Sequence, residues 1–438
     1  MKTDIKFGTD GWRGVIAKDF TFEKVELVAH AYAAYVLKKN KNKIIVIGYD
    51  GRFISNNFAR RMGEVLTAYG IKVFLSNKII PTPFLSFAAV VKRAYGGIMI
   101  TASHNPAEYN GIKFKTGTGG SVSKKVTAEV ESNINKILNK KIKIKTKTND
   151  KLLLNFDVTN DYINQLYKNI DIDLINKKKF KVLYESMGGA GLGILEKILK
   201  KVKIINQTDK FDPLFAGRYP EPLEENVKPA IKHLREIKAD LGIVTDGDAD
   251  RIAFIDEKGN FINSQKILGF LLLHLIKNKN YKAGVGITFA VSSIMENICT
   301  KKSIKLFTKP IGFKYIAELM EQGKVGYGGE ESGGIGYYKQ SLERDGIFIS
   351  LLTLEMMAME KKKLSEIIME MQKEFGKYYY DRIDLRITKN QIDNFKKKLP
   401  SLSPKTMAGL KVLRVEKIDG KKFILTQDSW LLMRPSGT

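Results

Sequence analysis

The chain has 438 residues, of which 43% are hydrophobic and 28% charged, a balance typical of globular proteins with about two to four domains. The only cysteine, Cys299, excludes an internal disulfide and fits a reducing compartment, so we expect a cytoplasmic protein. The longest apolar run, Ile267 to Ile276, is far shorter than the ~20 residues of a membrane span, and we expect no membrane partner.

The formal net charge of +27 arises from 74 Lys and Arg against 47 Asp and Glu. A protein that binds nucleic acid or phosphate would have such an excess. The lysines are scattered over the whole chain, however, and the densest run, 140–151, lacks an aromatic platform or zinc-finger spacing. We therefore attribute the charge to a compositional bias and expect no nucleic-acid partner.

Apolar strand-like runs alternate with helical periods, which predicts an α/β fold with mainly parallel sheets. Six of these runs end in polar or Gly-rich loops, in three pairs whose members lie roughly forty to sixty residues apart. Ligands bind outside the carboxyl ends of strands in open α/β sheets, so the pattern predicts three similar α/β domains in series around a central cleft. The runs are Lys43–Gly48, Gly97–Ile100, Phe180–Leu183, Leu241–Val244, Gly284–Ile287 and Val325–Gly328.

We place the three α/β domains at residues 1–150, 151–256 and 257–372. The remaining segment, 373–438, has a different pattern and predicts a smaller C-terminal α+β domain. Its expected strands are Arg382–Ile387, Leu410–Val415 and Phe423–Thr426.

The loop TASHNP, Thr101 to Pro106, places Ser103 and His104 directly after a predicted strand. A serine hydroxyl is a weak nucleophile unless it is activated, and no G-x-S-x-G elbow surrounds this one. Taken alone, Ser103 is most simply explained as a loop serine. His104 could orient a phosphate, move a proton or simply fix the loop.

The loop TDGDADR contains Asp246, Asp248 and Asp250 at alternate positions after a predicted strand. Three carboxylates so close together repel one another unless a cation neutralises them, and oxygen ligands suit a hard ion such as Mg²⁺. Manganese or zinc can occupy the same ligands. Three protein oxygens leave the shell incomplete, and a phosphate on Ser103 would supply a further ligand and gain a Lewis acid.

Two further loops contain groups that suit a sugar phosphate. GEESGG, which contains Glu330 and Ser332, offers carboxylates and a hydroxyl for sugar hydroxyls, although a solvated turn explains it equally. RPSGT, Arg434 to Thr438, combines a guanidinium, two hydroxyls and backbone N–H groups beside a glycine, a set that matches a phosphate monoester.

The motifs GTDGWRG (Gly8–Gly14), TASHNP, TDGDADR, GGEESGG and RPSGT occur in the order found in the α-D-phosphohexomutases. The chain resembles this superfamily from near its N-terminus to its last residue. The superfamily includes phosphoglucomutases, phosphomannomutases and phosphoglucosamine mutases. The resemblance implies an enzyme that interconverts hexose 1-phosphate and hexose 6-phosphate through a phosphoserine and a hexose 1,6-bisphosphate.

The resemblance also implies a role for each matching residue. The catalytic residues would be Ser103, His104, Arg13 and Lys113. One Mg²⁺ would be held by Ser103, Asp246, Asp248 and Asp250. The sugar phosphate would be bound by Arg251, Lys314, Glu330 and Ser332, and its distal phosphate by Arg434, Ser436, Gly437 and Thr438.

The chain departs from the family pattern in two places. Family members usually continue past RPSGT with an acidic residue and a terminal helix, so we expect a shortened C-terminal domain. Pro310 stands where some members have lysine, and Glu331 stands where phosphoglucosamine mutases usually have glutamine. Both features favour glucose 1-phosphate as substrate over glucosamine phosphates.

Several alternatives stay open. The protein could be a phosphomannomutase or an enzyme with dual specificity, and either a monomer or a homodimer. Outside the mutases, a non-catalytic sugar-phosphate binding protein and a phosphohydrolase with an aspartate nucleophile would use similar loops.

Overall fold

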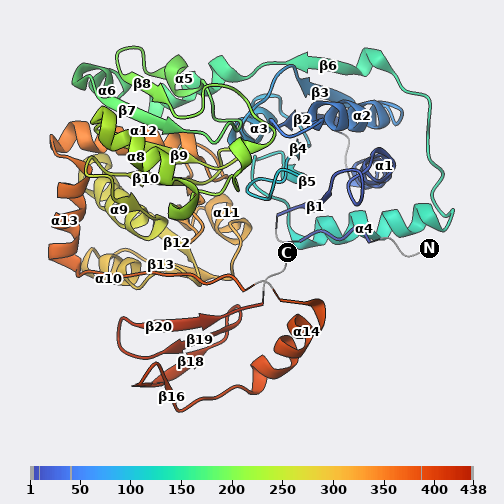
Figure 1. Cartoon of the computed structure of the whole chain (residues 1–438). Coiled ribbons are helices and arrows are strands. Elements are labelled where there is room, and N and C mark those ends of the chain that lie inside the picture. Colours follow the sequence, from blue (N-terminus) through green and yellow to red (C-terminus); the bar gives the residue numbers. More distant parts are fainter. Residues whose placement is uncertain (1–3, 9, 40–41, 386, 436–438) are drawn as a thin grey trace.

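The computed structural model describes residues 4–8, 10–39, 42–385 and 387–435 (Figure 1). The first unit is a six-stranded sheet in the order β1-β5-β4-β2-β3-β6, in which β4, β2, β3 and β6 run parallel. Its strands are β1 (Trp12–Val15), β2 (Ile44–Tyr49), β3 (Lys72–Ser76), β4 (Gly96–Ile100), β5 (Tyr109–Thr116) and β6 (Leu153–Phe156). Its helices are α1 (Phe22–Lys39), α2 (Ser55–Thr67), α3 (Thr82–Val91), α4 (Lys124–Leu138) and the 3₁₀ turn η1 (Asp150–Leu152).

The second unit contains a five-stranded sheet in the order β11-β10-β9-β7-β8. β7 pairs with β8 and β9 in parallel, and β10 and β11 complete one edge in antiparallel fashion. The strands are β7 (Lys181–Glu185), β8 (Lys203–Asn206), β9 (Leu241–Thr245), β10 (Ile252–Ile255) and β11 (Phe261–Ile262). The helices are α5 (Thr159–Asn169), α6 (Ile172–Lys178), α7 (Leu195–Ile198), α8 (Lys228–Ile237) and the 3₁₀ turns η2 (Phe215–Gly217) and η3 (Glu224–Asn226).

The third unit has a four-stranded sheet in the order β13-β12-β14-β15. The central strands β12 and β14 are parallel, and β15 is antiparallel to β14. The strands are β12 (Gly284–Thr288), β13 (Leu306–Lys309), β14 (Val325–Gly329) and β15 (Ile335–Tyr337). The helices are α9 (Ser264–Lys279), α10 (Ile294–Lys301), α11 (Lys314–Glu321), α12 (Gly346–Glu360) and α13 (Leu364–Phe375).

The C-terminal unit is small, and its strand pairs are all antiparallel. It extends away from the other three units in Figure 1 and is reached through a segment without regular structure. It contains α14 (Lys389–Lys398), η4 (Leu399–Ser401), β16 (Thr406–Met407), β17 (Leu410–Lys411), β18 (Arg414–Glu416), β19 (Lys421–Ile424) and β20 (Trp430–Met433). The expected class, three α/β domains in series plus a smaller C-terminal domain, is therefore confirmed. Nowhere in the described ranges is a helix both long and apolar enough to cross a membrane.

Alternating side chains of β2 show how the first unit is joined to the others. Ile45 and Ile47 pack in one hydrophobic cluster with residues of α1, α2 and α4. Val46, which points to the opposite face because strand side chains alternate, belongs to a second cluster. That cluster continues through Phe84 and Tyr162 to Phe348 in the third unit, so the three α/β units share one core. A shared core fixes the positions of the loops that each unit contributes.

The six predicted strand-to-loop junctions form three neighbouring pairs. β2 pairs with β4, β7 with β9 and β12 with β14, each in parallel. The carboxyl ends of each pair therefore lie side by side at one edge of their sheet.

The expected domain boundaries fall too early, because they separate elements from the sheets and helices to which they belong. β6 (153–156) completes the first sheet, beyond residue 150. β11 (261–262) pairs with β10 in the second sheet, beyond residue 256. The third boundary, at residue 372, cuts α13, which continues to Phe375.

The C-terminal strands also differ from expectation. Residues 382–385 and 387 form no strand, and Ile383 and Leu385 are 79% and 76% exposed. Within the described ranges no strand pairs with this segment, so its alternation of polar and apolar residues was insufficient to form a strand. The expected strand 410–415 is divided into β17 and β18, and β20 was not predicted.

Close contact between β12 and β14 generates a prediction. A Cβ on Gly328 would lie 2.1 Å from the carbonyl oxygen of Gly286, whereas one on Gly120 would meet its neighbours at 3.7 Å. We expect Gly328→Ala to lower the free energy of unfolding by about 1–3 kcal/mol through overpacking. Gly120→Ala, the control, should change it by no more than about 0.5 kcal/mol. Urea denaturation of both variants measures the difference, and equal stabilities would contradict this account.

Candidate active site

One buried arginine stabilises the loop that contains Ser103 through hydrogen bonds to its backbone. Arg52, which is buried, forms an ion pair with Asp50 at 3.2 Å. Ser103 has a left-handed backbone with φ of 52°, a strained conformation that requires support from its surroundings. Its N–H donates to Thr101 Oγ1 at 2.8 Å. The Arg52 guanidinium supplies the remaining support by donating to the carbonyl oxygens of Ser103, Asn105, Pro106 and Tyr109 at 2.6–3.0 Å.

Ser103 meets the aspartate loop across the seam between the first two units. Its hydroxyl donates to Asp246 Oδ2 at 2.8 Å, and both residues are buried. The backbones approach closely here, since a Cβ on Gly247 would lie 2.7 Å from the Ser103 carbonyl oxygen. The structure thus brings Ser103 to Asp246, which is 143 residues away in sequence.

The three aspartates form a compact, fully buried cluster. One carboxylate oxygen from each of Asp246, Asp248 and Asp250 lies within 4.8 Å of the others. Burial and the two neighbouring carboxylates raise the pKa of Asp246 well above its ordinary value. Burial acts to raise the pKa of Asp248 as well, but the ammonium of Lys113 outweighs it and lowers that pKa.

The donor set of this cluster fits a hard divalent cation. Among the described residues, Oδ1 of Asp248 and Oδ1 of Asp250 have no hydrogen-bond donor, although both atoms are buried. Buried carboxylate oxygens without partners are unfavourable unless a cation binds them. A ligand set made only of oxygen suits Mg²⁺ better than softer metals.

Lys113, on β5, partly neutralises the cluster. Its Nζ lies 2.8 Å from Asp248 Oδ2, 2.9 Å from Asp250 Oδ2 and 3.1 Å from Asp10 Oδ2. Burial favours the neutral amine, but these three carboxylates outweigh it and raise the pKa of Lys113, which stays charged.

Three further predicted residues surround Ser103. His104 Nδ1 lies 3.5 Å from Ser103 Oγ, and burial together with nearby arginines lowers the pKa of His104 well below its ordinary value. Arg13, on β1, donates to the side chain of Asn105 in the same loop. Arg251 pairs with Glu221 at 3.0 Å, and its backbone N–H donates to Asp246 Oδ1 at 3.0 Å.

Arg344, just before α12, was missed in the sequence and connects the three α/β units. Its guanidinium lies 2.6 Å from Asp250 Oδ2 in the second unit and 2.8 Å from Asp10 Oδ2 in the first. It also pairs with Glu330 of its own unit at 3.1 Å. Beside it, Glu343 pairs with Lys115 of the first unit, and both side chains are fully buried. The sequence feature that could have indicated this role is the charged triplet Glu343–Asp345, which stands directly before an apolar helix.

The third-unit residues lie near this network. Burial raises the pKa of Glu330 to about 7, although Arg344 opposes the shift. Ser332 is in the same loop and is partly buried. Lys314 begins α11, is buried, and lines a small depression together with Gly8 and Asp10. The structure therefore brings the third-unit loop and Lys314 to the N-terminal loop of the first unit.

Arg434, in contrast, lies in the C-terminal unit, away from the cluster. Its recorded ion pair is with Asp419 of the same unit, at 3.1 Å. The other residues predicted for the distal phosphate, Ser436, Gly437 and Thr438, lie outside the described residues.

Three family models match consecutive parts of the chain. They are described as phosphoglucomutase/phosphomannomutase α/β/α domain I, at residues 4–141, domain II, at 160–259, and domain III, at 263–375.

Full-length relatives agree with these matches. The chain is 30% identical to a phosphoglucomutase/phosphomannomutase of Thermococcus kodakarensis and 32% identical to a phosphoglucosamine/phosphogalactosamine mutase of Sulfurisphaera tokodaii. Each alignment covers 99% of this chain and 92% of the relative. A crystal structure assigned to a phosphomannomutase of Thermus thermophilus superposes with a TM-score of 0.88 at 32% identity, covering 99% of this chain and 94% of that one.

Arg344→Met tests the connection between the units. The substitution leaves Asp10, Asp250 and Glu330 without their shared donor, and breaking a buried ion pair is strongly destabilising. We expect the free energy of unfolding to fall by about 3–5 kcal/mol. The matched change Arg414→Met, at an exposed pair with Glu416, should lower it by no more than about 1 kcal/mol. Denaturant unfolding compares the two variants. Similar losses in the free energy of unfolding would show that Arg344 does not connect the three units.

Proposed function

The chain belongs to the phosphoglucomutase/phosphomannomutase family of α-D-phosphohexomutases, and on this premise we propose that it interconverts α-D-glucose 1-phosphate and glucose 6-phosphate. Membership makes it a mutase, a kind of isomerase. Its relatives include mutases named for glucose, mannose and glucosamine phosphates, so the family alone leaves the sugar open. Glu331 and Pro310, which differ from the phosphoglucosamine mutase pattern, support glucose.

One observation carries the proposal. Ser103 Oγ is 2.8 Å from a carboxylate of a buried three-aspartate cluster, and Arg13, Lys113 and Arg251 surround the same point. Phosphoryl transfer depends on positioning and on stabilisation of the charge on three phosphate oxygens. A serine beside a cation-binding cluster and several fixed cations meets both requirements.

In the first half of the reaction, a phosphate on Ser103 moves to the free hydroxyl of a hexose 1-phosphate. The bond between phosphorus and Ser103 Oγ breaks, and a bond to the sugar O6 forms. The O6 proton passes to a ring nitrogen of His104, which lies beside Ser103, and His104 gives that proton to the departing Ser103 Oγ. Arg13 and Lys113 hold the transferring phosphoryl group and stabilise its charge.

In the second half, the hexose 1,6-bisphosphate presents its other phosphate. The bond between phosphorus and O1 breaks, and a new bond to Ser103 Oγ forms. His104 takes the proton from Ser103 Oγ as this bond forms and gives it to O1, and the hexose 6-phosphate leaves. Ser103 is again phosphorylated, so the cycle consumes no cofactor.

Asp246, Asp248 and Asp250, together with an oxygen at Ser103, would hold one Mg²⁺. A Mg²⁺ at this position supplies a Lewis acid that polarises the phosphate. The aspartates themselves are positioned by the chain, since Thr82 donates to Asp248 at 2.6 Å and two backbone N–H groups donate to Asp246 at 3.0 Å.

The remaining predicted residues bind the sugar. Glu330 and Ser332 accept and donate hydrogen bonds to its hydroxyls, and Arg251 and Lys314 supply positive charge around it. Arg434, with Ser436, Gly437 and Thr438, binds the distal phosphate. The C-terminal unit is attached through few contacts, such as the bond from the Ile311 N–H to Asp419, which suits a movement that closes the site over the sugar.

Ser103→Ala tests the role of the serine. We expect turnover of glucose 1-phosphate, with Mg²⁺ and a trace of glucose 1,6-bisphosphate, to fall by roughly a thousandfold or more, because the phosphoryl carrier is lost. Ser123→Ala, whose side chain makes no cap hydrogen bond at the start of α4, should keep activity within about twofold. A coupled assay that detects glucose 6-phosphate measures both. Retention of mutase activity by Ser103→Ala would exclude the serine as carrier.

Metal removal tests the aspartate cluster. We expect EDTA to reduce turnover by roughly 100-fold or more, and Mg²⁺ to restore it. The reason is that the Lewis acid lowers the activation barrier by about several kcal/mol. Asp248→Asn should not recover at the same Mg²⁺ concentration, whereas the exposed control Asp209→Asn should recover fully. Full activity in EDTA would rule out a metal-dependent reaction.

A further inference from the structure

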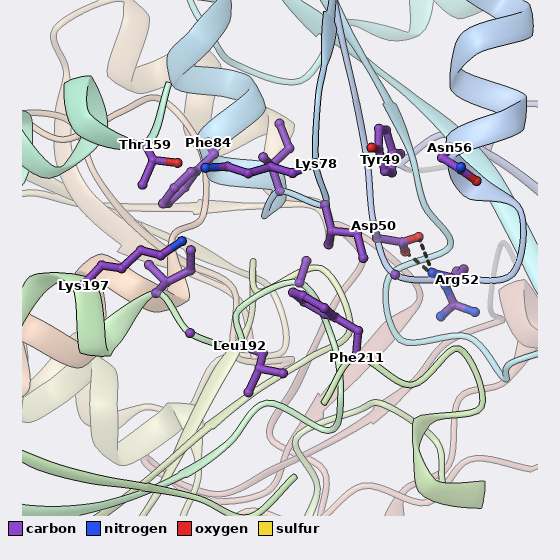
Figure 2. Close-up of a pocket in the computed structure, with 16 residues that line it drawn as sticks. Tyr49, Asp50, Arg52, Asn56, Lys78, Phe84, Thr159, Leu192, Lys197 and Phe211 are labelled. Atoms are coloured by element: carbon purple, nitrogen blue, oxygen red, sulfur yellow. Dashed lines mark hydrogen bonds and ion pairs between the residues drawn. The ribbon is translucent and has the colours of Figure 1, made fainter. Parts of the chain in front are cut away.

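A cavity of about 580 Å³ lies on the seam between the first and second units (Figure 2). The first unit contributes Tyr49 to Arg52 to its lining. The second unit contributes Ala190 and residues Leu192 to Ile194. The volume is in the range of small-molecule pockets. Ser103, Lys113 and the three aspartates do not line this cavity, so it is separate from the proposed active site.

The cavity has an apolar floor and a polar mouth. Ile80, Phe84 and Ile194 are at most 5% exposed and form much of the floor. Lys197 and Phe211 lie at the mouth and are exposed. Binding sites for small molecules commonly combine such apolar walls with a few polar groups that fix the orientation of the ligand.

The mouth has an unbalanced positive charge. Lys78 pairs with Asp157 at 2.5 Å, and Asp50 pairs with Arg52. For the side chain of Lys197, in contrast, the described part of the chain offers no ion-pair or hydrogen-bond partner. In Figure 2, the ammonium ends of Lys78 and Lys197 are directed toward the same part of the pocket. A negative group on a ligand would complement Lys197, while the ligand's apolar part occupies the floor.

The wall of the cavity is also the support of the Ser103 loop. Arg52, a lining residue, donates to three carbonyl oxygens of that loop and to that of Tyr109 at the start of β5. The cavity is lined by both units, and the Ser103–Asp246 hydrogen bond joins the same two units. A molecule bound here contacts the structure that aligns the serine with the aspartates.

We propose that this cavity binds a small organic anion with an apolar body. The anionic group pairs with Lys197 at the mouth, and the apolar body contacts Phe84 and Ile194 on the floor. Because residues of both units line the cavity, the bound ligand contacts both of them.

The fluorescent anion 1-anilinonaphthalene-8-sulfonate, which has an aromatic body and one sulfonate, is a suitable probe. We expect saturable binding to the full chain with one site in the cavity. Lys197→Glu should weaken binding roughly fivefold or more by charge reversal. Leu192→Trp should weaken it at least as much, because the larger side chain fills the space. Fluorescence titration measures both without any turnover assay, so its result is independent of the mutase proposal.

Matched controls separate the cavity from unspecific adsorption. Lys200→Glu makes the same charge change three residues away, and Leu214→Trp adds the same ring at a site that is 65% exposed; neither residue lines the cavity. Both controls should bind like the wild type. Absence of saturable binding, or equal binding by Lys197→Glu and Lys200→Glu, would overturn the proposal. If Leu192→Trp does not fold, as judged by thermal unfolding, the pair of surface lysine variants decides alone.

Discussion

Three buried carboxylates at the centre of the molecule need positive partners, and these partners come from all of the α/β units. Asp246, Asp248 and Asp250 all come from one loop of the second unit and are fully buried. The first unit contributes Lys113 and the third contributes Arg344. Because buried charges without partners are strongly unfavourable, no unit can move away without exposing or unbalancing this cluster. The charges that suit phosphate chemistry therefore also hold the three units together.

The C-terminal unit differs from the other three in this respect. A continuous hydrophobic core joins the α/β units through Phe84, Tyr162 and Phe348. Of the described residues in α14 and β16–β20, none belongs to this core, and contacts such as Lys422 over the ring of Phe289 at 4.6 Å connect the unit to the others. A rigid site with a weakly attached fourth unit is the arrangement that a closing movement requires.

Much of the site could be predicted because its residues follow apolar strands in recognisable motifs. The ends of β4 and β9 place Ser103 and Asp246 at the edges of two sheets, as the strand-to-loop pattern indicated. Arg52 and Arg344 were missed because each acts through tertiary contacts. Arg52 binds carbonyl oxygens that any residue could offer, and Arg344 meets partners from three units. The predicted strand at 382–387 failed for a related reason, since a strand needs a neighbour as well as an alternating pattern.

The most direct test of the account is to follow the phosphoryl group itself. The protein would be incubated with glucose 1,6-bisphosphate labelled with ³²P, digested, and the labelled peptide identified. We expect label on Ser103, stable in acid as a serine phosphate, and transfer of that label to added glucose 1-phosphate. Label on an aspartate, or label released only as inorganic phosphate, would contradict it and point to a phosphohydrolase.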